Sequence, residues 1–272
     1  MRIVHRVSMS SSPEVSAELA SLGVEVGSTG FVSFEVDETH PRWPALRAWV
    51  ARRGALDLAY TTFSDDEVAA APCLELVPDS HHGYPQPDED SFGYLSATYD
   101  LTDYCETCGV GLRQVAPFQM KGEPKWGRRG ILQLNWVFDE FFVTPQVWSA
   151  VFEPLGVGCR RVMTPRGDEL ETVVQLVVGI EADIATDGLE AETCGSCGRT
   201  RYLPVARGPF PALLSEPAGV LVKTRQWFGS GASAHRRVLV GQQARRALDT
   251  ERVRGVSFRP VAGVRLSGGR PA

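Results

Sequence analysis

Two copies of a short cysteine motif constrain this chain more than any other feature. Cys105-Glu-Thr-Cys108-Gly109 returns 89 residues later as Cys194-Gly-Ser-Cys197-Gly198. A Cys-x-x-Cys-Gly turn is the knuckle of zinc ribbons, in which two thiolates converge on one ion and the glycine permits the backbone turn. Two knuckles supply four soft ligands, the number that a closed tetrahedral zinc site needs. We therefore expect one structural Zn²⁺ ion bound by Cys105, Cys108, Cys194 and Cys197.

Other uses of the four thiols stay open at this point, namely two disulfides, a redox pair or unliganded thiols. A thioredoxin-like redox motif needs a strand-to-helix setting and gains nothing from a second copy. The 85 residues between Cys108 and Cys194 exceed the spacing of ordinary zinc fingers, but the entropic cost of closing a loop grows slowly with its length. A four-thiolate site has no open coordination position, so the expected ion does not imply an enzyme.

The knuckles belong to an internal repeat. Gly130-Ile-Leu132 and Gly219-Val-Leu221 match at the same offset of 89 residues. Further downstream, Val143–Val151 corresponds to Val240–Leu248 at a slightly larger offset. The pattern of each copy predicts a knuckle, an extended segment, a short helix and a closing strand, in that order. Because such a short helix must pack its apolar face on strands, the sequence predicts one α+β body over 96–272, with repeat units at about 96–165 and 185–272.

The first 95 residues have a different pattern, that of a small acidic α/β region. Strands are expected over 2–8 and 31–36, and helices after Ser12-Pro13, over 44–53 and over 64–71. The stretch 78–92 is rich in proline and acids, which suits a surface loop. We expect the domain boundary near residue 95.

Charge is distributed unevenly along the chain. Residues 1–95 contain 6 basic and 15 acidic residues, whereas residues 199–272 contain 14 basic and 3 acidic ones. The basic end could form a face for nucleic acid, while the acidic region could neutralise it within the same molecule. The candidate arginines are Arg199, Arg201, Arg207, Arg225, Arg236, Arg237, Arg245, Arg246, Arg252 and Arg254.

Composition excludes several classes of protein. With 43% hydrophobic and 22% charged residues the chain is globular, and its most apolar run, Val173–Ile180, is far shorter than the roughly 20 residues of a membrane span. The N-terminus lacks the apolar core of a secretory signal, so we expect a cytoplasmic protein with reduced thiols and no membrane partner. None of the common catalytic motifs is present, and we expect no enzyme.

For several other residues, a structural role is a simpler interpretation than a catalytic or ligand-binding one. Cys73 and Cys159 lie beside apolar residues, where a free cysteine behaves as a small core side chain. His81 and His82 stand in an acidic loop with Asp79, Asp88 and Asp90, and we expect them to be solvent-exposed rather than a second metal site. The segment Gly229–His235 lacks the Lys-Ser/Thr ending of a phosphate-binding loop and is expected to be a hairpin loop.

The two knuckles, Arg199 after the second one and the closing segment Gly255–Val261 together resemble the bacterial double-CXXCG motif proteins, over roughly residues 96–272. Some members of that family are immunity proteins, which neutralise a cognate toxin in the producing cell. The resemblance implies a zinc-binding, non-enzymatic immunity-type protein with a protein toxin as its partner. A zinc-ribbon binder of nucleic acid or ribonucleoprotein is the alternative, and a redox or hydrolytic enzyme comes third.

An immunity protein needs a rigid body with a charged surface complementary to its toxin. The acidic region could mimic a polyanion and occupy the basic active site of a nuclease toxin. The acids that would do so are Asp65, Asp66, Glu67, Asp88, Glu89 and Asp90.

Overall fold

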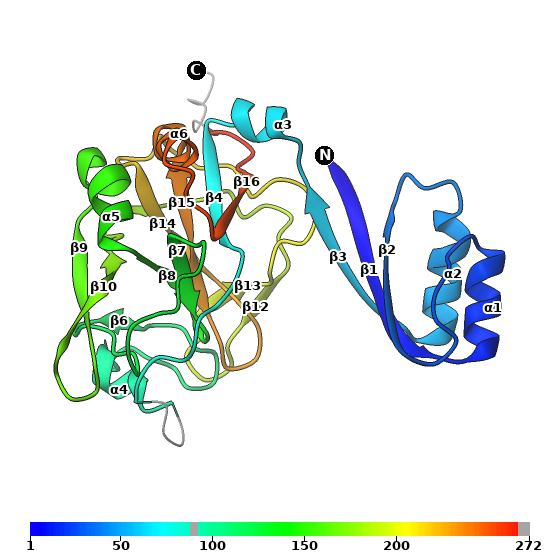
Figure 1. Cartoon of the computed structure of the whole chain (residues 1–272), viewed down its shortest axis with the longest axis horizontal. Helices are drawn as coiled ribbons and strands as arrows, with labels where there is room; N and C mark the ends of the chain where they lie inside the picture. The colour runs from blue at the N-terminus through cyan, green and yellow to red at the C-terminus, as the bar shows by residue number, and fades with distance from the viewer. Residues whose placement is uncertain (88–91, 266–272) are drawn as a thin grey trace. The chain divides into compact units, whose positions relative to one another are not determined.

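The computed structural model describes residues 1–87 and 92–265 and contains two compact units (Figure 1). The N-terminal unit comprises Met1–Glu67 and the short segment Val205–Pro209. The main unit comprises Val68–Pro204 and the chain from Phe210 onward. Both units combine helices with mostly antiparallel sheets, which confirms the predicted α+β class. Within the described residues, every helix is too short or too polar to span a bilayer.

The N-terminal unit is a three-stranded antiparallel sheet with two helices on one of its faces (Figure 1). Its first strand is central, and the other two strands are both edges. Val7, Leu19 and Trp49 represent the buried layer between the sheet and the helices. The elements are β1 (Arg2–Ser11), α1 (Pro13–Ser21), β2 (Gly30–Asp37), α2 (Trp43–Arg53) and β3 (Leu56–Thr62).

Local signals explain where these helices begin and end. The Ser12 hydroxyl accepts a hydrogen bond from the Val15 amide at 3.2 Å and caps α1, where the next residue is proline. Helix α2 ends at Arg53 and is capped by Gly54, whose φ of +61° is the left-handed conformation that closes many helices.

The main unit contains two larger sheets and several short elements. Strands of the first sheet lie in the order β7-β8-β10-β9, and those of the second in the order β12-β13-β14-β15-β4-β16, with β11 beside β14. The first sheet consists of β7 (Ile131–Leu134), β8 (Val137–Val143), β9 (Cys159–Met163) and β10 (Glu169–Leu176). The second consists of β4 (Cys73–Pro78), β11 (Glu181–Ala182), β12 (Ala191–Thr193), β13 (Thr200–Tyr202), β14 (Leu221–Phe228), β15 (His235–Gly241) and β16 (Val256–Pro260).

The element order after the first knuckle is the same as the order after the second. A hairpin is followed by a helix and a strand, as β7, β8, a helical segment and β9 in one case and as β14, β15, α6 and β16 in the other. The first helical segment starts as α5 (Pro145–Val147), continues as a π-helical turn over Trp148–Phe152 and ends as a 3₁₀ turn over Glu153–Leu155. Helix α6 covers Gln242–Thr250.

Each of these two sheets also takes in a strand that precedes the other knuckle. Strand β10, which comes before the second knuckle, lies antiparallel between β8 and β9 of the first sheet. Strand β4, which comes before the first knuckle, lies antiparallel between β15 and β16 of the second sheet. This exchange of strands joins the two halves, and one apolar core runs through both, with Phe141, Phe152 and Leu221 among its buried members.

The exchange also explains where the units divide. The sequence places a boundary near residue 95, but the N-terminal unit ends at Glu67 and residue 95 lies inside the main unit. Because β4 pairs with two strands from the C-terminal part of the chain, residues 73–78 are held in the main unit. The remaining short elements are α3 (Asp65–Ala70), α4 (Tyr94–Thr98), β5 (Tyr99–Asp100) and β6 (Arg113–Gln114).

Candidate metal centre

The two knuckles occupy equivalent places in the main unit, each in the loop of a short antiparallel ribbon. The first lies between β5 and β6, in which Tyr99 is opposite Gln114. The second lies between β12 and β13, in which Ala191 is opposite Tyr202. A knuckle at the end of a ribbon is the arrangement of zinc ribbons.

The structure brings the four predicted cysteines together. Their sulfur atoms all lie within 4.8 Å of one another, and they form the one group of three or more such ligands found in the described residues. Across the two knuckles, the Cys105 and Cys194 sulfurs are 3.9 Å apart, and those of Cys108 and Cys197 are 3.7 Å apart. All six cysteines of the chain are free thiols rather than disulfides.

These distances fit one tetrahedral ion. A zinc–sulfur bond of about 2.3 Å gives a tetrahedron with an edge of about 3.8 Å between sulfurs, close to both measured separations. Four thiols form a soft donor set, which binds zinc, copper(I) or iron. The cysteine cluster could therefore hold a metal ion, and all four positions of a tetrahedral ion would be filled by protein sulfur.

The glycine of each knuckle is required by backbone conformation. Gly109 and Gly198 have φ of +78° and +69°, in the left-handed region that disfavours other residues. At Gly109 the neighbourhood is also crowded, because an added Cβ would lie 2.5 Å from the Ala234 amide nitrogen. The first knuckle therefore packs directly against the loop between β14 and β15.

The surroundings favour the thiolate form of part of the cluster. The Arg199 guanidinium donates a hydrogen bond to the Cys197 sulfur at 3.4 Å and lowers the pKa of that thiol to about 6. Backbone amides of the second knuckle lower the pKa of Cys194. Burial instead raises the pKa of Cys108 to about 12, so a bound cation is what would stabilise four thiolates at once.

Arg201 ties the two knuckles to the loop beside them. Its side chain, 10% exposed, donates to the Cys108 carbonyl at 3.0 Å and pairs with Glu192 at 2.6 Å. It also donates to the carbonyl of Gly231 in the β14–β15 loop. One guanidinium on the second ribbon thus fixes the backbone of the first knuckle.

The other cysteine and histidine candidates lie apart from this cluster. Cys73 is 3% exposed in β4, and burial raises the pKa of its thiol to about 11. Cys159 is half-buried, and burial raises its pKa as well. His81 is exposed, as expected, and His82 is half-buried. Partial burial lowers the pKa of both, and the His81 ring packs against Phe138 with the ring centres 5.4 Å apart.

Many of the candidate arginines are paired within the chain. Six of the ten form an ion pair with a carboxylate: Arg201 with Glu192, Arg207 with Glu38, Arg225 with Glu181, Arg236 with Glu181, Arg237 with Glu75, and Arg245 with Asp249. Much of the positive charge expected for a nucleic-acid face is therefore compensated.

The candidate acids are only partly described. Asp65, Asp66 and Glu67 form the first turn of α3, and Glu67 is paired with the amino terminus of Met1 and accepts a hydrogen bond from the Ser64 amide at 2.8 Å. Asp88, Glu89 and Asp90 lie outside the described residues.

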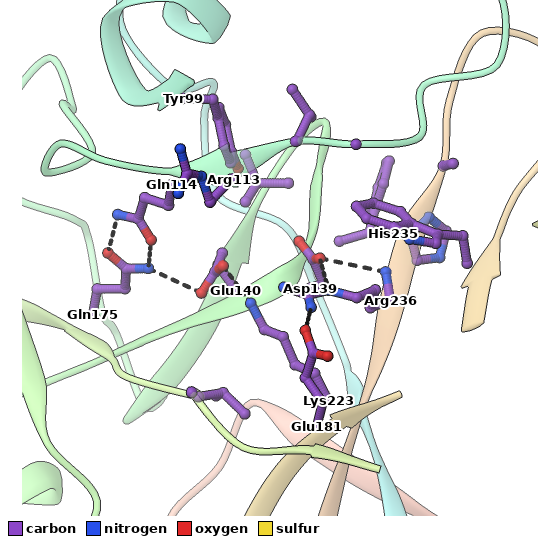
Figure 2. Close-up of a pocket in the computed structure, with 18 of the residues that line it drawn as sticks. Tyr99, Arg113, Gln114, Asp139, Glu140, Gln175, Glu181, Lys223, His235 and Arg236 are labelled. Carbon is purple, nitrogen blue, oxygen red and sulfur yellow. Dashed lines mark hydrogen bonds and ion pairs between the residues drawn. The ribbon is translucent and has the colours of Figure 1, made fainter. Parts of the chain in front are cut away.

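Sequence reasoning missed a second group of charged residues, which lines a cavity of about 450 Å³ (Figure 2). In this cavity Glu140 of β8 is paired with Lys223 of β14, and both side chains are almost fully buried. Gln175 of β10 donates to Glu140 at 2.9 Å and exchanges two hydrogen bonds with Gln114, at 2.7 and 2.8 Å. The chain of contacts links the two large sheets.

The same cavity shows what burial does to titratable groups. Burial raises the pKa of Glu140 against the opposing effect of Lys223, and it holds the pKa of Tyr99 well above its ordinary range. Nearby, Arg236 pairs with Glu181 and lies 3.9 Å from Asp139 (Figure 2). The sequence signals for this network are a lysine within the strand Leu221–Phe228 and a glutamate within the apolar strand Val137–Val143, and the two residues are 83 positions apart.

A scan with models of known protein families finds no match to this chain, and a search among curated proteins finds no similar sequence. What the protein does must therefore be argued from its own residues.

Proposed function

We propose that this protein is a non-catalytic, zinc-binding protein of the immunity type, which binds and neutralises a cognate bacterial toxin in the cytoplasm of the producing cell. The observation that carries the proposal is the cluster of four cysteine sulfurs within 4.8 Å, contributed by two knuckles 89 residues apart. In this proposal the cluster makes the centre of the main unit rigid, and the surface of the protein binds the toxin.

Zinc is the ion that the donor set favours in a structural role. Four thiolates fill a tetrahedral site completely, so substrate or water has no open position at the metal. The ion would cross-link the β5–β6 ribbon to the β12–β13 ribbon. Its binding free energy would then add directly to the stability of the fold.

The N-terminal unit offers a surface for a protein partner. The face of its sheet opposite the helices carries four exposed apolar side chains, with exposed fractions of 73% for Phe31, 56% for Leu56, 54% for Leu58 and 36% for Tyr60. The strand register places all four on one face, because they are opposite Ser10, Ser8, Arg6 and Val4 of β1. We name these four residues the open face. An exposed apolar patch of this kind marks interaction sites.

Charged residues border the open face and would give it selectivity. Arg6 of β1 and Glu35 of β2 are paired in register on the same side of the sheet as Leu58. Apolar anchors surrounded by charge are typical of specific protein interfaces. The open face therefore supports a protein partner better than the acids of α3, since Glu67 is already paired.

The resemblance to the double-CXXCG proteins is the reason for proposing that the bound protein partner is a toxin. The alternative, a nucleic-acid binder, has less support from the arginines because six of the ten candidates have carboxylate partners. An excess of unpaired cationic groups is what phosphate binding requires.

The test combines capture with growth. Tagged protein is recovered from native lysate with and without nuclease treatment, and the gene of any stoichiometric protein partner that remains bound after nuclease is then expressed alone and together with this protein. We expect the partner to arrest growth alone and coexpression to restore it. The double variant Leu56→Ser and Leu58→Ser should lose the rescue, whereas Val115→Ser, an exposed apolar residue of the main unit at 63% exposure, should keep it.

Two results would contradict the proposal. One is material that nuclease releases completely, which favours the nucleic-acid alternative. The other is a stoichiometric partner whose expression has no effect on growth, because neutralising a toxin is then not the function.

A further inference from the structure

Beside the first knuckle lies a cleft with aromatic walls. It encloses about 500 Å³ in the main unit and is separate in chemistry from the charged cavity of Figure 2, although the two share part of one wall. Its aromatic residues are Phe92, Tyr94, Tyr104, Trp136 and Phe138. We refer to it as the aromatic cleft.

Two of these aromatic residues have an unfavourable backbone conformation. Phe92 and Trp136 have φ of +62° and +67°, in the left-handed region that bulky residues rarely adopt. Trp136 stands in the two-residue turn between β7 and β8, where glycine or asparagine would be relaxed. Backbone strain at exposed positions is often kept for a functional reason.

Burial does not account for this strain. The side chains of Phe92 and Trp136 remain 47% and 39% exposed, although apolar groups of this size are normally covered. Their rings contact each other with centres 4.6 Å apart, and the Tyr84 ring lies 4.4 Å from the Trp136 ring on the rim. The turn itself is held in place, since Asn135 donates two hydrogen bonds to the Gly83 carbonyl, at 2.7 and 2.9 Å.

The charge of the aromatic cleft has one sign. Of the residues that the structure describes, Glu106 of the first knuckle is the one charged residue that lines it, and none of the lining residues is lysine or arginine. Among the described residues, Glu106 has no ion-pair partner. The rest of the lining is apolar or small, including Leu95, Leu112 and Ala234.

We propose that the aromatic cleft binds an organic cation, namely a substituted ammonium group on a small apolar scaffold. The negative faces of aromatic rings attract such a cation, and quaternary ammonium groups are recognised in this way in many proteins. Glu106 adds a full negative charge at the rim. A neutral apolar ligand would use the rings alone, and an anion would be repelled.

A matched pair of probes separates charge from shape. Choline and 3,3-dimethylbutan-1-ol have nearly the same size. The quaternary nitrogen of choline, which carries the positive charge, is replaced by a carbon atom in the neutral alcohol. Titration of the full chain by calorimetry should show choline binding about tenfold more tightly than the neutral alcohol, as expected for a cation over several rings.

Variants then locate the site. Glu106→Gln keeps the size of the side chain and should weaken choline binding about threefold or more without changing the binding of the alcohol. Trp136→Leu should weaken choline binding about tenfold. Leu214→Ala, at an exposed apolar residue of the main unit that does not line the cleft, is the control and should change neither. Unchanged metal content in Glu106→Gln and Trp136→Leu shows that the knuckle is intact.

The proposal is overturned if the alcohol binds as tightly as choline, since the cleft is then merely apolar. It is equally overturned if choline does not bind at all, or if its affinity is the same in the wild type and in Trp136→Leu. This test is independent of toxin immunity, because it needs no protein partner.

Discussion

The buried pair of Glu140 and Lys223 makes a quantitative prediction about stability. The side chains are only 7% and 3% exposed, and the pair joins β8 of one sheet to β14 of the other. Removing one partner of a buried ion pair leaves an uncompensated charge, at a cost of about 3–5 kcal/mol. We expect Lys223→Met to lower the free energy of unfolding at pH 7 by this amount, as measured by urea denaturation.

The matched control is an exposed pair in the same unit. Arg161 and Glu169 are 3.7 Å apart, with side chains 64% and 58% exposed. Because water screens such a pair, Arg161→Met should cost less than about 1 kcal/mol. The double variant Lys223→Met and Glu140→Met should recover most of the loss, since an apolar pair of similar volume carries no buried charge.

The loss should also depend on pH, with a sign that follows from burial. Burial raises the pKa of Glu140 above its ordinary 4.5, and the charge of Lys223 opposes that rise. Without Lys223 the pKa of Glu140 rises further. A carboxyl group whose pKa is raised on folding makes its full contribution to stability below its unfolded-state pKa. That contribution is lost as the pH increases through the folded-state pKa. The deficit of Lys223→Met should therefore shrink as the pH falls from 7 toward 4.5.

The reasoning is refuted if Lys223→Met costs no more than Arg161→Met. A deficit that is the same at pH 7 and near pH 4.5 would refute the assignment of the loss to a stranded carboxylate.

Two further predictions concern the cysteine cluster. Gly109→Ala should lower the melting temperature and destabilise the chain by about 2 kcal/mol or more, because it combines a left-handed φ with a Cβ 2.5 Å from the Ala234 nitrogen. The control is Gly195→Ala, whose Cβ meets nothing within 4 Å. Equal melting temperatures of the two variants would contradict the packing argument. Arg201→Met should cost about 1–3 kcal/mol in urea unfolding, since it strands the Cys108 carbonyl, and a neutral effect would show that Arg201 does not brace the knuckle.

Local signals in the sequence predicted much of the secondary structure. The Ser12-Pro13 cap, the Gly54 stop and the alternation in Arg2–Ser8 all correspond to elements of the N-terminal unit. Strand β3 was not predicted, although Leu56, Leu58 and Tyr60 stand at alternate positions, as in a strand. Such alternation normally indicates a buried side, whereas the structure leaves these three side chains exposed.

Long-range pairing accounts for the rest of what was missed. Nothing local in Cys73–Pro78 indicates that this strand lies between two strands from residues 235–260. The Glu140–Lys223 pair has the same origin, because its members are 83 residues apart. The four cysteines could be predicted as metal ligands because each pair of thiols lies within a few residues of sequence. The sulfur–sulfur distances of 3.7 and 3.9 Å between the two knuckles depend on the fold.

The most direct test of the central claim is the metal content of the purified full-length chain, measured by inductively coupled plasma mass spectrometry. We predict one zinc ion per chain. Serine in place of Cys105, Cys108, Cys194 or Cys197 should release the metal and lower the melting temperature, while Cys159→Ser, outside the cluster, should retain it. A wild-type chain without zinc, or four cluster variants that keep full zinc content, would contradict the account.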